Sequence, residues 1–144
     1  VFSYMLSSLF ITQAIAEWIG TLDVNRWVLM TFVMLFLLVA GFFLPPVAVI
    51  LMAAPILLPI ITTAGFDPIW FAVVLTINME IGLISPPVGL NLYVINGIAP
   101  DISLKTILKG SLPFVACMVI AIVLLCFFPA LATWLPDVVM GAAV

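Results

Sequence analysis

The polar and conformationally special residues between positions 78 and 91 are the part of this chain best suited to chemistry. They interrupt a long apolar segment with a carboxylate, amides, a hydroxyl, prolines and glycine. The candidates are Asn78, Glu80, Ser85, Pro86, Pro87, Gly89 and Asn91. Hydrocarbon offers no water to broken backbone or buried charge, so such a break is tolerated only where it faces protein or a water-filled cavity. In membrane proteins these places usually bind or pass something polar.

A helix break at Ser85-Pro86-Pro87 would leave backbone groups without helical partners. Carbonyl groups before Pro86 can coordinate Na⁺, and amides after Pro87 can meet an anionic group. Gly89 lets the backbone approach closely, while the side chains of Ser85 and Asn91 add neutral oxygens. The simpler alternative is a kink that only helps packing.

The turn from Gly41 to Pro46 is the second candidate. Pro45 and Pro46 have no amide hydrogens, so the carbonyls near Gly41 are left available. Facing the break, this turn could complete a sodium site formed by backbone carbonyls near Ser85 and Gly41, or it could gate the substrate. The alternative is an ordinary turn between helices at the membrane surface.

Glu80 is an acidic residue well inside an apolar run, and no cation is expected at its depth. It could support the break by accepting hydrogen bonds from free amides, or it could contact a bound cation directly. Both interpretations stay open. Asn78 has the same two interpretations, of which structural support is preferred.

Composition indicates an integral membrane protein. Hydrophobic residues make up 67% of the 144 residues and charged residues 6%, whereas soluble domains carry roughly a quarter charged residues. A net charge of −3 leaves no basic patch for nucleic acid. The absence of histidine removes the commonest metal ligand and general base. Cys117 and Cys126 are interpreted as small apolar residues of one span.

The elements that would position these residues follow from the apolar runs and their interruptions. They are the end of a preceding helix with an interfacial helix at 1–26, a re-entrant hairpin at 27–62, a broken transmembrane helix at 67–99, an interfacial amphipathic helix at 101–110, a last transmembrane helix at 111–136 and a tail at 137–144. The hairpin limbs reach roughly 27 and 22 Å, against a bilayer core of about 30 Å. Two marginal spans remain the alternative to a re-entrant hairpin. Asp67 and Pro68 are typical of a helix start.

The distribution of positively charged residues predicts how the chain is oriented in the membrane. Lys105 and Lys109 precede the last helix and should be cytoplasmic, which places the C-terminus in the periplasm. Arg26 and Asp67 then lie on the outer side, where Arg26 counts weakly against the assignment. The chain starts inside an apolar region without a visible signal peptide, and we expect it to be a C-terminal fragment of a longer protein.

Several motifs resemble one family of membrane transporters. They are Gly41-Phe42-Phe43-Leu44-Pro45-Pro46-Val47-Ala48, Pro55-Ile56-Leu57-Leu58-Pro59, the run from Asn78 to Leu92, Gly97-Ile98-Ala99-Pro100-Asp101, Phe128-Pro129 and Trp134-Leu135-Pro136. The chain resembles, over residues 27 to 137, the C-terminal part of the large membrane subunit of tripartite ATP-independent periplasmic (TRAP) transporters.

This resemblance implies an all-α polytopic membrane protein with a re-entrant helical hairpin and a discontinuous transmembrane helix, forming one half of an inverted-repeat, elevator-type transporter. It also implies sodium-driven uptake of organic acids across a bacterial or archaeal cytoplasmic (inner) membrane, with Na⁺ as coupling ion and no cofactor. The implied partners are a small TRAP membrane subunit, a periplasmic substrate-binding protein, the remainder of the large subunit and the lipid bilayer.

Three alternatives remain beside this interpretation. Another sodium-coupled carboxylate transporter of the same superfamily would share the motifs. A non-transporting assembly subunit would explain the hydrophobicity but not the break. A membrane-embedded enzyme would need a base, nucleophile or metal cluster at membrane depth, and the sequence offers no such constellation.

Overall fold

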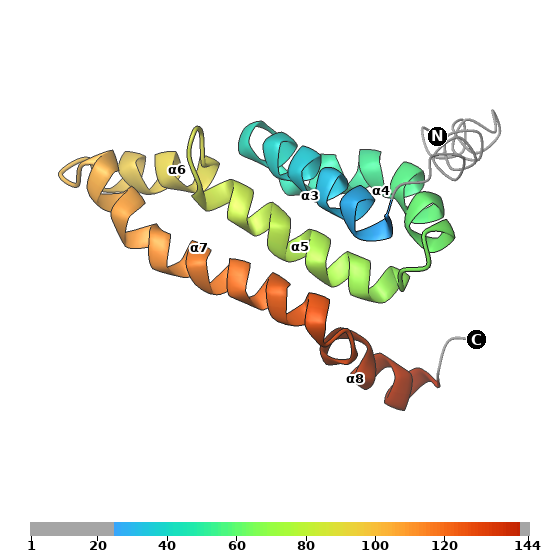
Figure 1. Cartoon of the computed structure of the whole chain (residues 1–144). Coiled ribbons are helices and arrows are strands. Elements are labelled where there is room, and N and C mark those ends of the chain that lie inside the picture. The colour runs from blue at the N-terminus through green and yellow to red at the C-terminus, as the bar shows by residue number, and fades with distance from the viewer. Residues whose placement is uncertain (1–24, 142–144) are drawn as a thin grey trace.

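Residues 25–141 form six helices in a computed structural model (Figure 1). The helices are α3 (Arg26–Phe43), α4 (Pro46–Thr63), α5 (Pro68–Ile84), α6 (Leu90–Ile98), α7 (Leu104–Phe127) and α8 (Ala130–Met140). By length and composition, α3, α4 and α7 can each cross a membrane. The prediction of an all-helical fold is therefore confirmed for the described residues, with three candidate membrane spans. The segment predicted at 1–26 falls almost wholly outside the described residues, as does the end of the predicted tail.

Side chains at the helix starts explain why α3, α5 and α7 begin where they do. Asn25 accepts a hydrogen bond from the Trp27 amide at 2.9 Å, and Ser103 caps α7. Asp67 accepts from the first amides of α5, and Pro68 takes the first helical position. The expected helix start at these two residues is confirmed, because a carboxylate there satisfies amides that have no helical partner.

Helix α5 is the centre of the fold. It contacts each of the other five described helices, and Figure 1 shows α3 and α4 on one side of it and α7 on the other. Its buried side chains include Trp70, Phe71, Val74 and Met79, each at most 2% exposed. The core is therefore the face that α5 shares with its neighbours, while the outward faces stay apolar for lipid or further protein.

The helical path is interrupted after Ile84 and resumes at Leu90. Helix α6 does not start directly after the prolines, because Gly89 has a positive φ of 58°, a conformation that glycine adopts without steric cost. A Cβ on Gly89 would also lie 2.9 Å from the Ser85 carbonyl oxygen, so the break is closed tightly around this residue.

Helix α7 differs from the predicted division into an interfacial helix at 101–110 and a span at 111–136. It runs without interruption from Leu104 to Phe127. Lys105 and Lys109 lie in its first turns. Charged residues indicate polar surroundings, but they do not end a helix. The helix stops before Pro129, and α8 follows as a separate element.

An indole donor compensates for the break between α7 and α8. Pro129 has no amide hydrogen, so the Leu125 carbonyl, four residues earlier, loses its helical donor. The Nε1–H group of Trp70 donates to this carbonyl at 2.7 Å. The break therefore leaves no unpaired carbonyl at Leu125, and it is tied to the start of α5.

Candidate functional site

A close approach between two helices brings together Gly41, in the last turn of α3, and Gly82, in the last turn of α5. A Cβ on Gly82 would lie 2.8 Å from the Gly41 carbonyl carbon and 3.0 Å from its oxygen. The two backbones are thus in direct contact, which only glycine permits at this distance. The end of α3, which leads into the turn, and the end of α5, which leads into the break, are neighbours in space.

Each of these two glycines begins the same six-residue pattern. Gly41 is followed by Pro45 and Pro46, and Gly82 is followed by Pro86 and Pro87 at the same spacing. In a helix the carbonyl of residue i accepts from the amide of residue i+4. Because proline has no amide hydrogen, each pattern deprives two consecutive carbonyls of their helical donors.

The carbonyls concerned are those of Gly41 and Phe42 in α3 and of Gly82 and Leu83 in α5. All four lie at the C-terminal ends of their helices, where the helix dipole contributes negative potential. The electrostatic potential at two neighbouring helix C-termini therefore favours a cation over an anion. Sodium binding through such helix ends is the chemistry that discontinuous transmembrane helices provide.

The Ile84 carbonyl, next in sequence, is contacted by α7. The Ser111 hydroxyl lies 3.2 Å from this oxygen and 2.8 Å from the Leu108 carbonyl oxygen. A hydroxyl carries one hydrogen, so Ser111 divides a single donor between these two acceptors. Helix α7 thereby touches the end of α5 where the break starts.

Asn78 and Glu80 lie on opposite faces of α5. Asn78 is buried and its Nδ2 group donates to the Met34 carbonyl of α3 at 3.0 Å. Glu80 is exposed, so the structure does not bring its carboxylate into the Gly41–Gly82 contact. Asn78 instead fastens α5 to α3 one turn before that contact.

The other predicted residues separate into buried and exposed groups around the break. Ser85 and Gly89 are buried, whereas Pro86, Pro87 and Asn91 are exposed. Pro45 forms the N-cap of α4 without a side-chain hydrogen bond, and Pro46 is the first residue of that helix. The structure thus brings the candidate turn and the break together through Gly41 and Gly82, and it leaves the Asn91 side chain exposed on α6.

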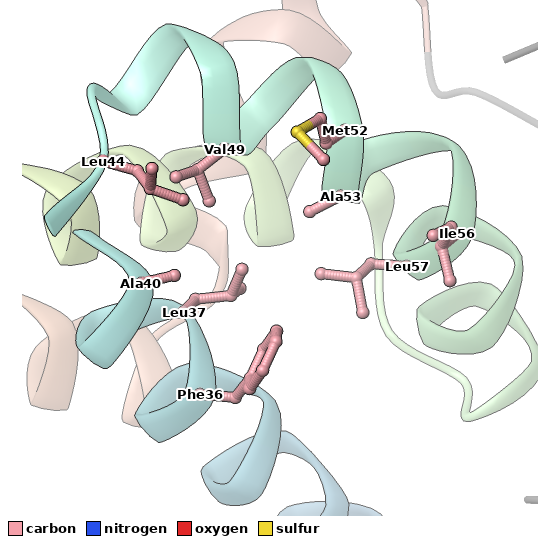
Figure 2. Close-up of a pocket in the computed structure, with 9 residues that line it drawn as sticks. All are labelled: Phe36, Leu37, Ala40, Leu44, Val49, Met52, Ala53, Ile56 and Leu57. Carbon is pink, nitrogen blue, oxygen red and sulfur yellow. The ribbon is translucent and has the colours of Figure 1, made fainter. Parts of the chain in front are cut away.

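A pocket between α3 and α4 does not extend this polar site. It has a volume of about 250 Å³ and is lined by Phe36, Leu37, Ala40, Leu44, Val49, Met52, Ala53, Ile56 and Leu57. Figure 2 shows these side chains pointing from both helices into the shared space, with carbon and sulfur atoms only. None of the side chains that line this pocket carries an oxygen atom that could bind an ion. Within residues 25–141, no group of three His, Cys, Asp or Glu residues could hold a metal ion either.

Gly82 is the site residue that our sequence reasoning missed. The Gly-x-x-x-Pro-Pro pattern occurs twice in the sequence, and the candidates named from the sequence include its first glycine and both proline pairs but not Gly82. Comparing the two stretches with each other would have found Gly82. The contact between the two glycines needed the structure.

Comparisons with known proteins agree with the motifs. The sequence profile of the family described as "Tripartite ATP-independent periplasmic transporter, DctM component" matches residues 1–131. The C4-dicarboxylate TRAP transporter large permease protein DctM of Pseudomonas aeruginosa is 36% identical over 137 residues, which are 95% of this chain and 32% of that protein.

Two further relatives carry other names. The sialic acid TRAP transporter large permease protein SiaM of Vibrio cholerae is 32% identical over 141 residues, covering 98% of this chain and 33% of that protein. The isethionate TRAP transporter permease protein DctMQ of Oleidesulfovibrio alaskensis is 31% identical over 121 residues, covering 84% of this chain and 19% of that protein. The chain thus spans a third or less of the length of these relatives.

Proposed function

Because this chain belongs to the family of the DctM component of tripartite ATP-independent periplasmic transporters, we propose that it forms one half of the ion and substrate site of a sodium-coupled importer of organic acids. The family is one of multi-pass bacterial membrane permeases. This confirms the expected membrane transporter class and the expectation that the chain is not an enzyme. The remaining two thirds of the subunit would supply the other half of the site.

The pair of touching Gly-x-x-x-Pro-Pro segments carries this proposal. A sodium ion needs several oxygen ligands, and the ends of α3 and α5 offer freed carbonyls at Gly41, Phe42, Gly82 and Leu83. Side-chain carboxylates are not required, which fits the exposed position of Glu80. Backbone ligands on two separate helices make sodium affinity depend on how closely those helices approach.

The substrate would meet the opposite side of the break. Helix α6 begins at Leu90 after Gly89, and no side chain caps its first amides. Free amides at a helix N-terminus favour an anionic group. Two of the relatives are named for C4-dicarboxylates and for sialic acid, and we propose the organic acids as the substrate class. Sodium that draws α3 and α5 together would fix the break and thereby strengthen substrate binding, which is positive linkage.

The surrounding architecture is part of the same proposal. Helices α3 and α4 would form a re-entrant hairpin, and the discontinuous α5–α6 segment would move with it in an elevator-type transport step within an inverted repeat. A small membrane subunit and a periplasmic substrate-binding protein would complete the system. Lys105 and Lys109 would face the cytoplasm, with the C-terminus in the periplasm.

Uptake of an organic acid by the full transporter, with its binding protein and in proteoliposomes, tests the proposal. Replacing the sodium gradient by choline should abolish accumulation. The double variant Pro86→Ala/Pro87→Ala returns helical donors to Gly82 and Leu83, so it should insert normally and lose sodium-coupled uptake. Pro136→Ala is the matched control, because it removes an interior proline of α8, which follows the end of α7 that lies far from the break. Sodium-coupled uptake at wild-type level in the double variant would refute the proposed site.

A further inference from the structure

A pocket that carries charged side chains lies at the opposite ends of α3 and α5 from the glycine contact. It has a volume of about 240 Å³ and is lined by Arg26, Trp27, Gly65, Phe66, Asp67, Trp70 and Pro129. It combines one cation, one anion and three aromatic rings. We propose that this pocket binds the headgroup of a zwitterionic phospholipid, with the phosphate on Arg26 and the ammonium group on Asp67.

Aromatic rings hold the Arg26 guanidinium in place. Its central carbon lies 5.8 Å from the Trp27 ring centroid and 5.7 Å from that of Phe66, within the range of cation–π attraction. Phe66 is itself fixed between Trp27, edge-on at 5.3 Å, and Trp70, stacked at 5.3 Å. A guanidinium restrained in this way presents a fork of N–H donors that matches the geometry of a phosphate group.

Asp67 supplies the complementary charge on the same pocket. Its Oδ1 atom accepts hydrogen bonds from the amides of Ile69 and Trp70 at 2.8 and 2.9 Å. Both of these bonds use one oxygen, so Oδ2 is left for a donor outside the helix, and the side chain is exposed. An ammonium group carries three N–H donors. Separate positive and negative groups on one small pocket suit a ligand that carries both charges itself.

The surface next to this pocket distinguishes a lipid from a soluble zwitterion. A neighbouring pocket of about 240 Å³ shares Trp27 and continues along α3 past Val28, Thr31, Phe32 and Leu35. The Thr31 hydroxyl donates to the Trp27 carbonyl at 2.8 Å, so it offers no free donor to a ligand. Phe32 is 69% exposed and Leu35 54%. A headgroup bound at Arg26 would therefore have an apolar surface for its acyl chain directly beside it.

The depth of the pocket supports the same occupant. Tryptophan residues concentrate where hydrocarbon meets the headgroups of a bilayer, and Trp27 and Trp70 both line the pocket. The pocket lies at the start of α3, a helix long and apolar enough to cross the membrane. A headgroup site is expected at that end of a span, and it does not involve the sodium site at the other end.

Quantitative mass spectrometry of lipids retained by the full transporter tests this inference. The purified protein is equilibrated with mixed micelles containing equal amounts of phosphatidylethanolamine and phosphatidylglycerol, and the bound lipid is measured. Arg26→Gln and Asp67→Asn should each lower retained phosphatidylethanolamine about ten-fold, the effect of one lost charge-assisted hydrogen bond. Asparagine is also a good N-cap, so Asp67→Asn keeps the start of α5. Lys105→Gln, at the far end of the molecule, is the matched control.

Two additional measurements decide the nature of the ligand. Phe32→Asn leaves the headgroup pocket intact and should still lower lipid retention, because it places a polar group on the acyl-chain surface. Soluble phosphoethanolamine should compete poorly with the lipid. Wild-type retention of phosphatidylethanolamine in both charge variants would overturn the proposal, as would equal loss in Lys105→Gln. Efficient competition by phosphoethanolamine, with no effect of Phe32→Asn, would overturn the assignment to a lipid.

Discussion

Replacing Gly82 with alanine measures how far the glycine contact controls sodium binding. The new Cβ would lie 2.8, 3.0 and 3.1 Å from the carbonyl carbon, oxygen and Cα of Gly41. Carbon atoms in contact prefer about 3.5–4.0 Å, so the two backbones must separate by roughly 0.7 Å. Overpacking of this kind costs about 1–3 kcal/mol. Because the proposed ion ligands lie on both helices, the strain opposes the ion-bound arrangement, and half-saturating sodium should rise roughly 5- to 150-fold.

The assay is a sodium titration of substrate uptake by the full transporter in proteoliposomes at saturating substrate. Gly97→Ala is the matched control, since a Cβ there meets no atom within 4 Å. Both substitutions replace a helical glycine, so each gains a similar helix propensity of about 1 kcal/mol, and the difference isolates the contact. Melting temperatures without sodium separate a folding defect from an ion-binding defect. Equal half-saturating sodium for the two variants would refute the reasoning.

The remaining predictions concern individual hydrogen bonds and charges. Trp70→Phe should lower the free energy of unfolding by about 1–3 kcal/mol, because the Leu125 carbonyl loses its donor; adding Pro129→Ala should recover part of this in thermal unfolding, and no recovery would contradict the pairing. Asn78→Leu should cost about 0.6 kcal/mol in the same assay, the typical value of a hydrogen bond between membrane helices; unchanged stability would argue against the bond to α3. Glu80→Gln should leave half-saturating sodium within about two-fold, as expected for an exposed carboxylate outside the ligand set; a larger shift in uptake titrations would assign Glu80 to the ion.

Features that depend on covalent structure could be predicted from the sequence. Pro45, Pro46, Pro86 and Pro87 have no amide hydrogens, and the turn and the break lie where these prolines forbid a continuous helix. Asp67 likewise marks a helix start by its own chemistry. In each case the local residue determines the local backbone, so no knowledge of distant contacts was needed.

Features that depend on packing could not be predicted in this way. Gly82 and Gly41 lie on two helices that touch in space but are separated in the sequence by α4. No local sequence pattern states which glycines will be in contact. The sequence placed Glu80 well inside an apolar run but could not state which face of α5 carries it; among residues 25–141 its side chain is exposed. The continuity of α7 past Lys109 was also missed, because charge was used to infer a boundary that the backbone does not have.

The hydrogen bond from Trp70 to the Leu125 carbonyl also fixes how far α7 lies along the axis of α5. Sliding α7 along α5 by one helical turn would move this carbonyl by about 5.4 Å, well beyond hydrogen-bonding distance, and would leave both groups unpaired at about 1–3 kcal/mol each. The same slide would shift Lys105 and Lys109, at the other end of the helix, by one turn relative to α5. The hydrogen bond of one indole group thus helps to set the axial position of two lysines near the opposite end of α7.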